Sequence, residues 1–238
     1  MTPTVLDYPA GDVMCRGEVY TPENASGPLP VVLVTHAWDG LNDEVRSKAI
    51  RLATESGYIA FAIDIYGEGK VWEDASKLME VLTPYMEDRA LLTARMQAAA
   101  EAARQLPNAD PDRLGAMGYC FGGTAVLDLA RSGAAGVRGV VSFHGGLAGH
   151  TLPGPDTLAA KVMVLHGEDD PMVPPDMVAA FKAEMKEKKA DWQLHAYGNT
   201  VHAFTRPAAN NPDFGTVYNA AADRRSWQAM RDFFDEIF

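Results

Sequence analysis

The chain has 238 residues, 47% of them hydrophobic, and its 32 acidic residues outnumber 21 basic ones to give a formal net charge of -11. A chain of this length can bury one sizeable core, and we expect residues 1–238 to form a single domain. The negative charge argues against a nucleic acid or an anionic membrane as the partner.

The predicted elements alternate between strands and helices along the chain. The segment Val13 to Tyr20 alternates apolar and polar residues and is expected to form an antiparallel edge strand. Residues 66–86 have the least regular pattern and are expected to supply a short lid or pocket wall. Further strands are predicted at 31–35, 58–64, 113–117, 137–143 and 162–166, and helices at 44–56, 90–105, 124–130 and 218–238. Such alternation is typical of a mostly parallel sheet with helices on both faces.

The most informative motif is Gly118-Tyr119-Cys120-Phe121-Gly122, which lies between a short apolar run and a helical pattern. A Gly-x-Cys-x-Gly in this context indicates a nucleophile elbow with sulfur in place of the usual serine oxygen. The glycines remove Cβ atoms that would collide in so sharp a turn. The following helix N-terminus favours a thiolate, and the Phe121 amide is placed to donate to an oxyanion. The alternative for the cysteine alone is a small buried hydrophobic residue.

An acid and a histidine follow the cysteine in the chain order that is typical of such sites. Glu168, Asp169 and Asp170 lie in a loop directly after an apolar run, at the edge where open α/β sheets bind ligands. The spacing to the following Val-Pro pair favours Asp170, with Asp169 second. Among the six histidines, His202 is favoured because it comes after both nucleophile and acid, in a loop that has the freedom to reach both.

Taken together, these motifs resemble the dienelactone hydrolase family, a branch of the α/β-hydrolases with a Cys-His-Asp triad. The resemblance rests on the elbow, the Asp170-x-x-Val173-Pro174 turn and the His202-x-Phe204 loop, and it runs from the strand that ends at His36 through the last helix. It implies an α/β-hydrolase fold with no large cap domain. It also implies that Cys120 is the nucleophile, that His202 is the base and then the acid, and that Asp170 orients the imidazole.

The resemblance has further implications for the loop at residues 35–40 and for substrate binding. The Trp38 amide is the expected second oxyanion donor. In the best-known family members a glutamate that controls the ionisation of the cysteine stands in place of Ala37, and alanine cannot do this. Arg206 matches one of the arginines with which family members bind the carboxylate of dienelactone. For the other arginine there is no clear equivalent among the cations of the relevant region, which are Lys70, Lys77 and Arg89.

The predicted reaction is hydrolysis of a carboxylic ester or lactone through an acyl-enzyme on Cys120. Dienelactone-like (carboxymethylenebutenolide-like) compounds and activated small esters are the expected substrates. An apolar aromatic pocket is expected around the cysteine, although core packing is the alternative for most of its aromatic residues. The residues predicted to contact the substrate are Trp38, Tyr66, Tyr119, Phe204 and Arg206.

Three further functions stay open from the sequence. The same site could also act on organophosphate triesters, the fold could serve a non-catalytic ligand receptor, or Cys120 could be a thiol redox sensor with Cys15 as the only other thiol. We expect no metal and no cofactor, because no His/Cys/Asp cluster has ligand spacing. The N-terminus lacks a basic start followed by an apolar stretch, so we expect a cytoplasmic protein without a membrane partner, monomeric or homodimeric.

Overall fold

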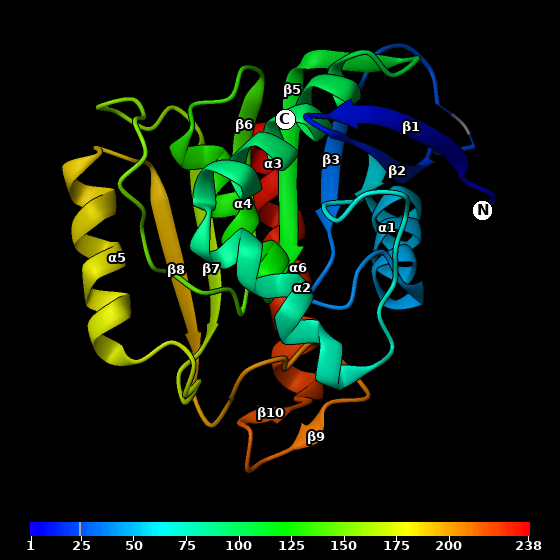
Figure 1. The fold of residues 1–238 in the computed structure, drawn as a ribbon. Coiled ribbons are helices and arrows are strands. Elements are labelled where there is room, and N and C mark those ends of the chain that lie inside the picture. Colours follow the sequence, from blue (N-terminus) through cyan, green and yellow to red (C-terminus); the bar gives the residue numbers. More distant parts are fainter. Residues whose placement is uncertain (24) are drawn as a thin grey trace.

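The computed structural model describes residues 1–23 and 25–238, apart from the side chain of Ala75. Within this part of the chain, eight strands form one sheet in the order β1-β2-β4-β3-β5-β6-β7-β8 (Figure 1). Strands β3 to β8 run parallel to one another, and β1 and β2 are antiparallel to their neighbours. The strands are β1 (Thr4–Ala10), β2 (Val13–Tyr20), β3 (Leu29–Thr35), β4 (Ile59–Ile63), β5 (Ala109–Tyr119), β6 (Val137–Phe143), β7 (Lys161–Gly167) and β8 (Trp192–Tyr197).

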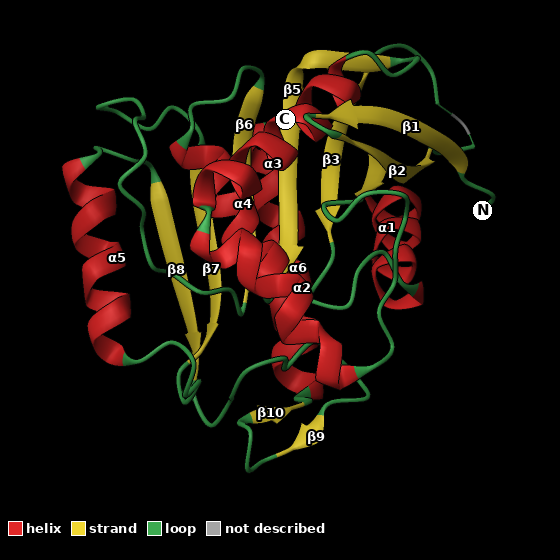
Figure 2. Cartoon of the chain, viewed as in Figure 1, coloured by secondary structure: helices red, strands yellow, loops and turns green. Residues whose placement is uncertain are grey.

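Helices cover both faces of this sheet (Figure 2). They are α1 (Asp43–Ser56), α2 (Ala75–Glu87), α3 (Arg89–Arg104), α4 (Phe121–Arg131), α5 (Pro175–Glu187) and α6 (Ala220–Ile237). Helices α3, α4 and α5 pack against one face, and α1 and α6 pack against the other. The predicted sheet, mostly parallel and covered on both faces, is therefore confirmed.

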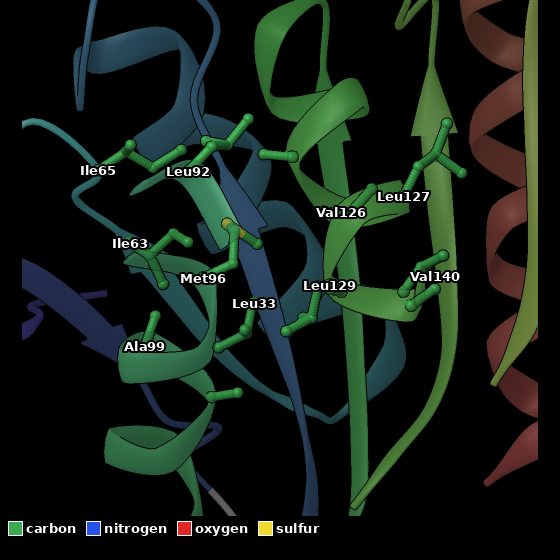
Figure 3. Packing of buried hydrophobic residues seen from close by; sticks show 14 of the residues in the cluster. Leu33, Ile63, Ile65, Leu92, Met96, Ala99, Val126, Leu127, Leu129 and Val140 are labelled. Atoms are coloured by element: carbon green, nitrogen blue, oxygen red, sulfur yellow. The ribbon is translucent and has the colours of Figure 1, made fainter. Parts of the chain in front are cut away.

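Two hydrophobic clusters, one on each face of the sheet, form the core. Leu33 of β3, Met96 of α3 and Val126 of α4 belong to the cluster shown in Figure 3. Val34 of β3 and Met230 of α6 belong to the other cluster. Because a central parallel strand is buried on both faces, its apolar residues form a continuous run and show no alternation.

Two sequence-based expectations differ from the structure. The segment Val13 to Tyr20 is antiparallel, as predicted, but it is not the edge strand, because β1 pairs with its outer side. Strand β1 was not predicted because its exposed positions carry both apolar and polar residues, and Val5 is among the exposed ones. The irregular region 66–86 contains most of helix α2, whose pattern is weak because it contains Pro84 and buries few residues. The expected lid or pocket wall in this region stays a prediction.

The carboxyl ends of the parallel strands meet at the lower edge of the sheet in Figure 1. The short strands β9 (Asn210–Asn211) and β10 (Thr216–Val217) form a hairpin below this edge. None of the helices in the described residues combines the length and apolar character needed to cross a bilayer. The three predicted catalytic residues come from segments that follow β5, β7 and β8 at this same edge.

Candidate active site

Cys120 occupies the turn between β5, which ends at Tyr119, and α4, which begins at Phe121. Its backbone has φ 54° and ψ -115°, a conformation that costs a non-glycine residue about 1–3 kcal/mol. Two hydrogen bonds hold it there: the Cys120 amide donates to the Phe143 carbonyl at 3.0 Å, and the Thr124 amide donates to the Cys120 carbonyl at 3.2 Å. The predicted strand-turn-helix is thus present, with the cysteine side chain partly exposed at its apex.

The two glycines of the motif are required by close packing. A Cβ atom on Gly118 would collide with the backbone of Gly122. A Cβ atom on Gly122 would lie 2.5 Å from the carbonyl oxygen of His36 and 2.6 Å from that of Thr35. The N-terminus of α4 therefore reaches the end of β3 only because no side chain separates them.

His202 forms a hydrogen bond from Nδ1 to Oδ2 of Asp170, 2.8 Å away, and both side chains are buried. The second carboxylate oxygen, Oδ1, accepts the Met172 amide at 2.9 Å. Glu168 and Asp169 are exposed. Of the three acids in this loop, the structure thus brings Asp170 to the histidine.

The loop that carries His202 is fixed by the hairpin below it. The His202 amide donates to the Gly215 carbonyl at 3.0 Å, and the His202 carbonyl accepts the Val217 amide at 3.2 Å. Gly215 in turn packs so tightly on the ring of Pro171 that a Cβ atom there would collide with it. The histidine, the hairpin and the acid loop therefore form one connected assembly.

The electrostatics of the site favour a protonated His202. Burial opposes the charged ring, but the negative charge of a Cys120 thiolate and the hydrogen bond with Asp170 outweigh it and raise the pKa of His202 to about 10. Within the described residues, the buried Nε2 atom has no hydrogen-bond partner. This nitrogen is therefore available for proton exchange with a reacting group.

The Trp38 loop is held next to the elbow by two buried rings. His36 is a neutral imidazole in this arrangement, because its Nδ1 donates to the Ala37 carbonyl at 2.6 Å while its Nε2 accepts the Ile65 amide at 3.2 Å. Burial also lowers its pKa. The Tyr66 hydroxyl donates to the Trp38 carbonyl at 2.7 Å.

Tyr66 also links this loop to the elbow, because its ring stacks on that of Phe121 at 5.9 Å between centroids. In the described part of the chain, neither the Trp38 amide nor the Phe121 amide donates a hydrogen bond. Both amides are therefore free for a ligand oxygen.

The predicted substrate contacts divide into two groups. Trp38 and Arg206 are partly exposed, and Tyr66 is buried beside them. Tyr119 and Phe204 are core residues: the Tyr119 ring stacks on Phe143, and Phe204 has no exposed surface. The structure thus places Tyr119 and Phe204 in the core, and their direct contact with a substrate stays a prediction. Tyr119 precedes the elbow by one residue, so strand alternation directs its ring into the core shared with α1 and α6.

Arg206 is held by two carboxylates, a feature that sequence reasoning missed. Its Nη2 lies 2.9 Å from Oδ2 of Asp39, and its Nε lies 3.2 Å from Oε2 of Glu44. Both acids belong to the segment that follows β3, so they are far from Arg206 in sequence. Their position near Ala37 was the only available signal.

His144 and Phe214 are two further residues of the site. The position of His144 could be predicted because it closes an apolar run, whereas sequence reasoning missed Phe214. The His144 ring meets the His202 ring at 5.1 Å, edge to face, and its Nε2 lies 2.9 Å from the Thr205 hydroxyl. Burial lowers the pKa of His144 far below its usual range, and the charge of His202 adds to this effect. Phe214 is 52% exposed and stacks on Trp38 at 6.4 Å. The signal for Phe214 was an aromatic residue in a turn shortly after His202.

The chain is similar to known proteins over most of its length. The chain is similar to a dienelactone hydrolase-like promiscuous phosphotriesterase from metagenomic libraries, with 40% identity and a TM-score of 0.94 over 100% of this chain and 98% of that one. It is 27% identical over 226 residues to a Yersinia pestis protein that carries the provisional name carboxymethylenebutenolidase, covering 90% of this chain and 81% of that protein.

More distant likeness shows the fold alone. The dienelactone hydrolase of Anabaena variabilis is 19% identical, with a TM-score of 0.67 over the whole of both chains. The predicted α/β-hydrolase fold is thus confirmed. The model of the dienelactone hydrolase family matches residues 15–238. This chain belongs to the dienelactone hydrolase family and is a hydrolase of that kind.

Proposed function

We propose that this protein cleaves carboxylic esters or lactones through a thioester intermediate on Cys120. The observation that carries the proposal is the buried His202–Asp170 pair, with 2.8 Å between Nδ1 and Oδ2, whose imidazole is close enough to Cys120 for the charge of the thiolate to raise its pKa. A nucleophile on a strained turn, a base, and a third group that orients the base make up the arrangement that covalent acyl transfer needs.

The proposed reaction has two halves. The Cys120 thiolate attacks the substrate carbonyl carbon, and the amides of Phe121 and Trp38 donate to the oxyanion of the tetrahedral intermediate. When this intermediate collapses, the carbon–oxygen bond breaks, and His202 gives its Nε2 proton to the leaving alcohol. Water then attacks the thioester while His202 takes its proton. The acid product leaves, and the thiolate–imidazolium pair is restored.

In this proposal, the thiolate–imidazolium pair of Cys120 and His202 accounts for the activation of the cysteine in the absence of the family's glutamate. At position 37 the chain has alanine, which has no charge to offer. A His202 pKa of about 10 supports an imidazolium at neutral pH. In this proposal His202 itself supplies the counter-charge of the thiolate.

Promiscuous hydrolysis of organophosphate triesters is a second candidate function. The observation that favours it is the 40% identity, over the whole chain, to a protein described as a promiscuous phosphotriesterase. A phosphoryl oxygen can occupy the same pair of amide donors as a carbonyl oxygen. Paraoxon is the probe for this candidate. Catalytic release of p-nitrophenol would support turnover, whereas a single equivalent would indicate trapping of the cysteine.

A ligand receptor and a redox sensor fit the site less well. A ligand receptor has no need of an oriented histidine beside a cysteine. A redox sensor would need an accessible resolving thiol, but Cys15 is buried within the sheet in β2. Burial also raises the pKa of the Cys15 thiol to about 11, so it is a poor partner for disulfide exchange.

The decisive experiment compares hydrolysis of p-nitrophenyl acetate and p-nitrophenyl butyrate by the wild type and by Cys120→Ala, with circular dichroism as the folding control. We expect Cys120→Ala to lose at least about 10³-fold in kcat. Mass spectrometry of quenched wild type should show the acyl group on Cys120. Retained activity in a folded Cys120→Ala protein would contradict the proposal.

Three further properties are proposed from the sequence. They are a single domain over residues 1–238, a cytoplasmic location, and a monomeric or homodimeric state that acts on a small molecule without nucleic acid. Light scattering after size-exclusion chromatography measures the oligomeric state directly.

A further inference from the structure

Arg206, a cation close to the proposed nucleophile, is already paired with acidic residues of the protein. Arg206 is close enough to Cys120 for the thiolate charge to affect it, yet its guanidinium makes ion pairs with both Asp39 and Glu44, at 2.9 and 3.2 Å. A substrate carboxylate that approached Arg206 would have to displace one of these acids. The displaced acid would then be left without its partner in a partly buried site.

The second cation of this cluster is also paired within the protein. Lys48, next in the same cluster, lies 3.6 Å from a carboxylate oxygen of Asp223 and donates to the Thr205 carbonyl at 3.2 Å. Among the described residues, the group formed by Arg206, Lys48 and their acidic partners thus has two cations against three carboxylates. The cluster as a whole is acidic.

Two of the three cations that sequence reasoning considered for a second carboxylate contact are also paired, whereas the third, Lys77, is an exposed residue of α2. Arg89 binds both carboxylate oxygens of Asp128, at 2.6 and 2.7 Å, and this aspartate is fully buried. Lys70 lies 3.0 Å from Glu68. Both side chains are therefore committed to partners within the protein.

Next to this charged cluster, the site also exposes an apolar surface. Trp38 and Phe214 stack on one another, and Phe214 remains half exposed although it is a large hydrophobic side chain. Trp38 also carries one of the two proposed oxyanion amides, so this aromatic pair lies beside the position of a reacting carbonyl. Such a surface suits an uncharged acyl or aryl group.

We propose that the Asp39–Arg206–Glu44 cluster makes this site selective for substrates with uncharged acyl groups, and that it disfavours carboxylate-bearing substrates of the dienelactone type. This inference rests on the proposed ester hydrolysis and names its substrate class. Neutral organophosphate triesters satisfy the same requirement.

The test compares p-nitrophenyl pentanoate with mono-p-nitrophenyl glutarate, whose acyl chain has the same length but ends in a carboxylate. We expect kcat/KM of the wild type to be about tenfold or more higher for the neutral ester. In Glu44→Gln, which frees one side of Arg206 and removes a negative charge, this ratio should narrow about threefold to tenfold.

The matched control is Asp43→Asn, which removes a charge from the neighbouring residue, whose side chain is 99% exposed. It should change the ratio by less than about twofold. If Glu44→Gln does not fold, the salt dependence of the wild type serves instead: the ratio should narrow between about 0.02 and 0.5 M NaCl, because salt screens the repulsion.

Wild-type activity on the glutarate that equals or exceeds activity on the pentanoate would overturn the inference while leaving ester hydrolysis intact. If the ratio of kcat/KM for the neutral ester to kcat/KM for the glutarate is as high in Glu44→Gln as in the wild type, the inference is also overturned, because the cluster is then not the cause of the selectivity. Absence of turnover with both esters would instead contradict the proposed function itself, and the inference with it.

Discussion

The elbow at Cys120 and the loop at His202 place their side chains in different ways. Cys120 is positioned mainly by two glycines beside it in sequence, because Gly118 and Gly122 allow backbone contacts that a Cβ atom would prevent, together with one hydrogen bond to the Phe143 carbonyl. His202 depends on distant partners: Asp170 lies 32 residues away, and Gly215 belongs to the hairpin. The sterics of nearby glycines therefore dominate the placement of the proposed nucleophile, whereas several long-range hydrogen bonds place the proposed base. Substitutions in the two regions should therefore differ in their effects on stability and activity.

The largest expected effect is on the base. Asp170→Asn removes the charge that stabilises and orients the His202 imidazolium, and we expect kcat to fall about 10³-fold to 10⁴-fold with the fold retained. Asp169→Asn, in the exposed neighbouring residue, should stay within about twofold of the wild type. Ester hydrolysis by both purified variants measures this. Equal losses in the two would mean that the pairing with Asp170 does not orient the base.

The pH dependence of stability tests the same assembly. The folded-state pKa of His202 is raised to about 10, so the stability it contributes is fully present below its unfolded pKa of about 6.5 and is lost as pH rises through 10. We expect the difference in unfolding free energy between the wild type and His202→Gln to shrink by at least about 1 kcal/mol between pH 7 and 10.5. Urea titrations measure this difference. A difference that grows with pH would show that the ring is neutral in the folded protein.

Alanine substitutions at two glycines, one in each region, compare how strongly the elbow and the His202 loop depend on close packing. Gly122→Ala in the elbow would force apart the start of α4 and the end of β3 and should cost about 1–3 kcal/mol of stability. Gly198→Ala lies in the turn shortly before His202 and meets no atom within 4 Å. It should change stability by less than about 1 kcal/mol, in either direction. Thermal and urea unfolding of both variants provide the readout. Equal effects would contradict the steric account of the elbow.

The smallest expected effect concerns a helix cap that supports the His202 loop. Asn219 caps α6, accepting the Ala221 and Ala222 amides, and its Nδ2 donates to the Thr200 hydroxyl at 2.9 Å. Asn219→Ala should cost about 1 kcal/mol of stability and lower kcat/KM severalfold. Asp88→Ala removes a comparable cap from α3 and should cost similar stability with activity unchanged. If kcat/KM of Asn219→Ala is unchanged, the cap does not contribute to the position of the His202 loop.

Much of the fold could be predicted because its signals are local. Continuous apolar runs marked the central parallel strands, and periodic apolar residues marked α1, α3 and α6. The outer strand β1 and helix α2 were missed because each buries only part of its surface. Weak burial leaves a weak pattern, so the rim of the molecule is harder to predict than its centre.

The fold class, the strand-turn-helix at Cys120, and the order of the proposed nucleophile, acid and histidine could all be inferred from the sequence alone. These features depend on spacing and on the sterics of glycine, which are properties of neighbouring residues. Three features needed the folded chain: which of the acids after β7 meets His202, the place of Tyr119 and Phe204 in the core, and the ion pairs of Arg206 with Asp39 and Glu44. Hydrogen bonds and ion pairs act over a few ångströms in space, and a chain that folds brings together residues whose separation in sequence carries no sign of that contact.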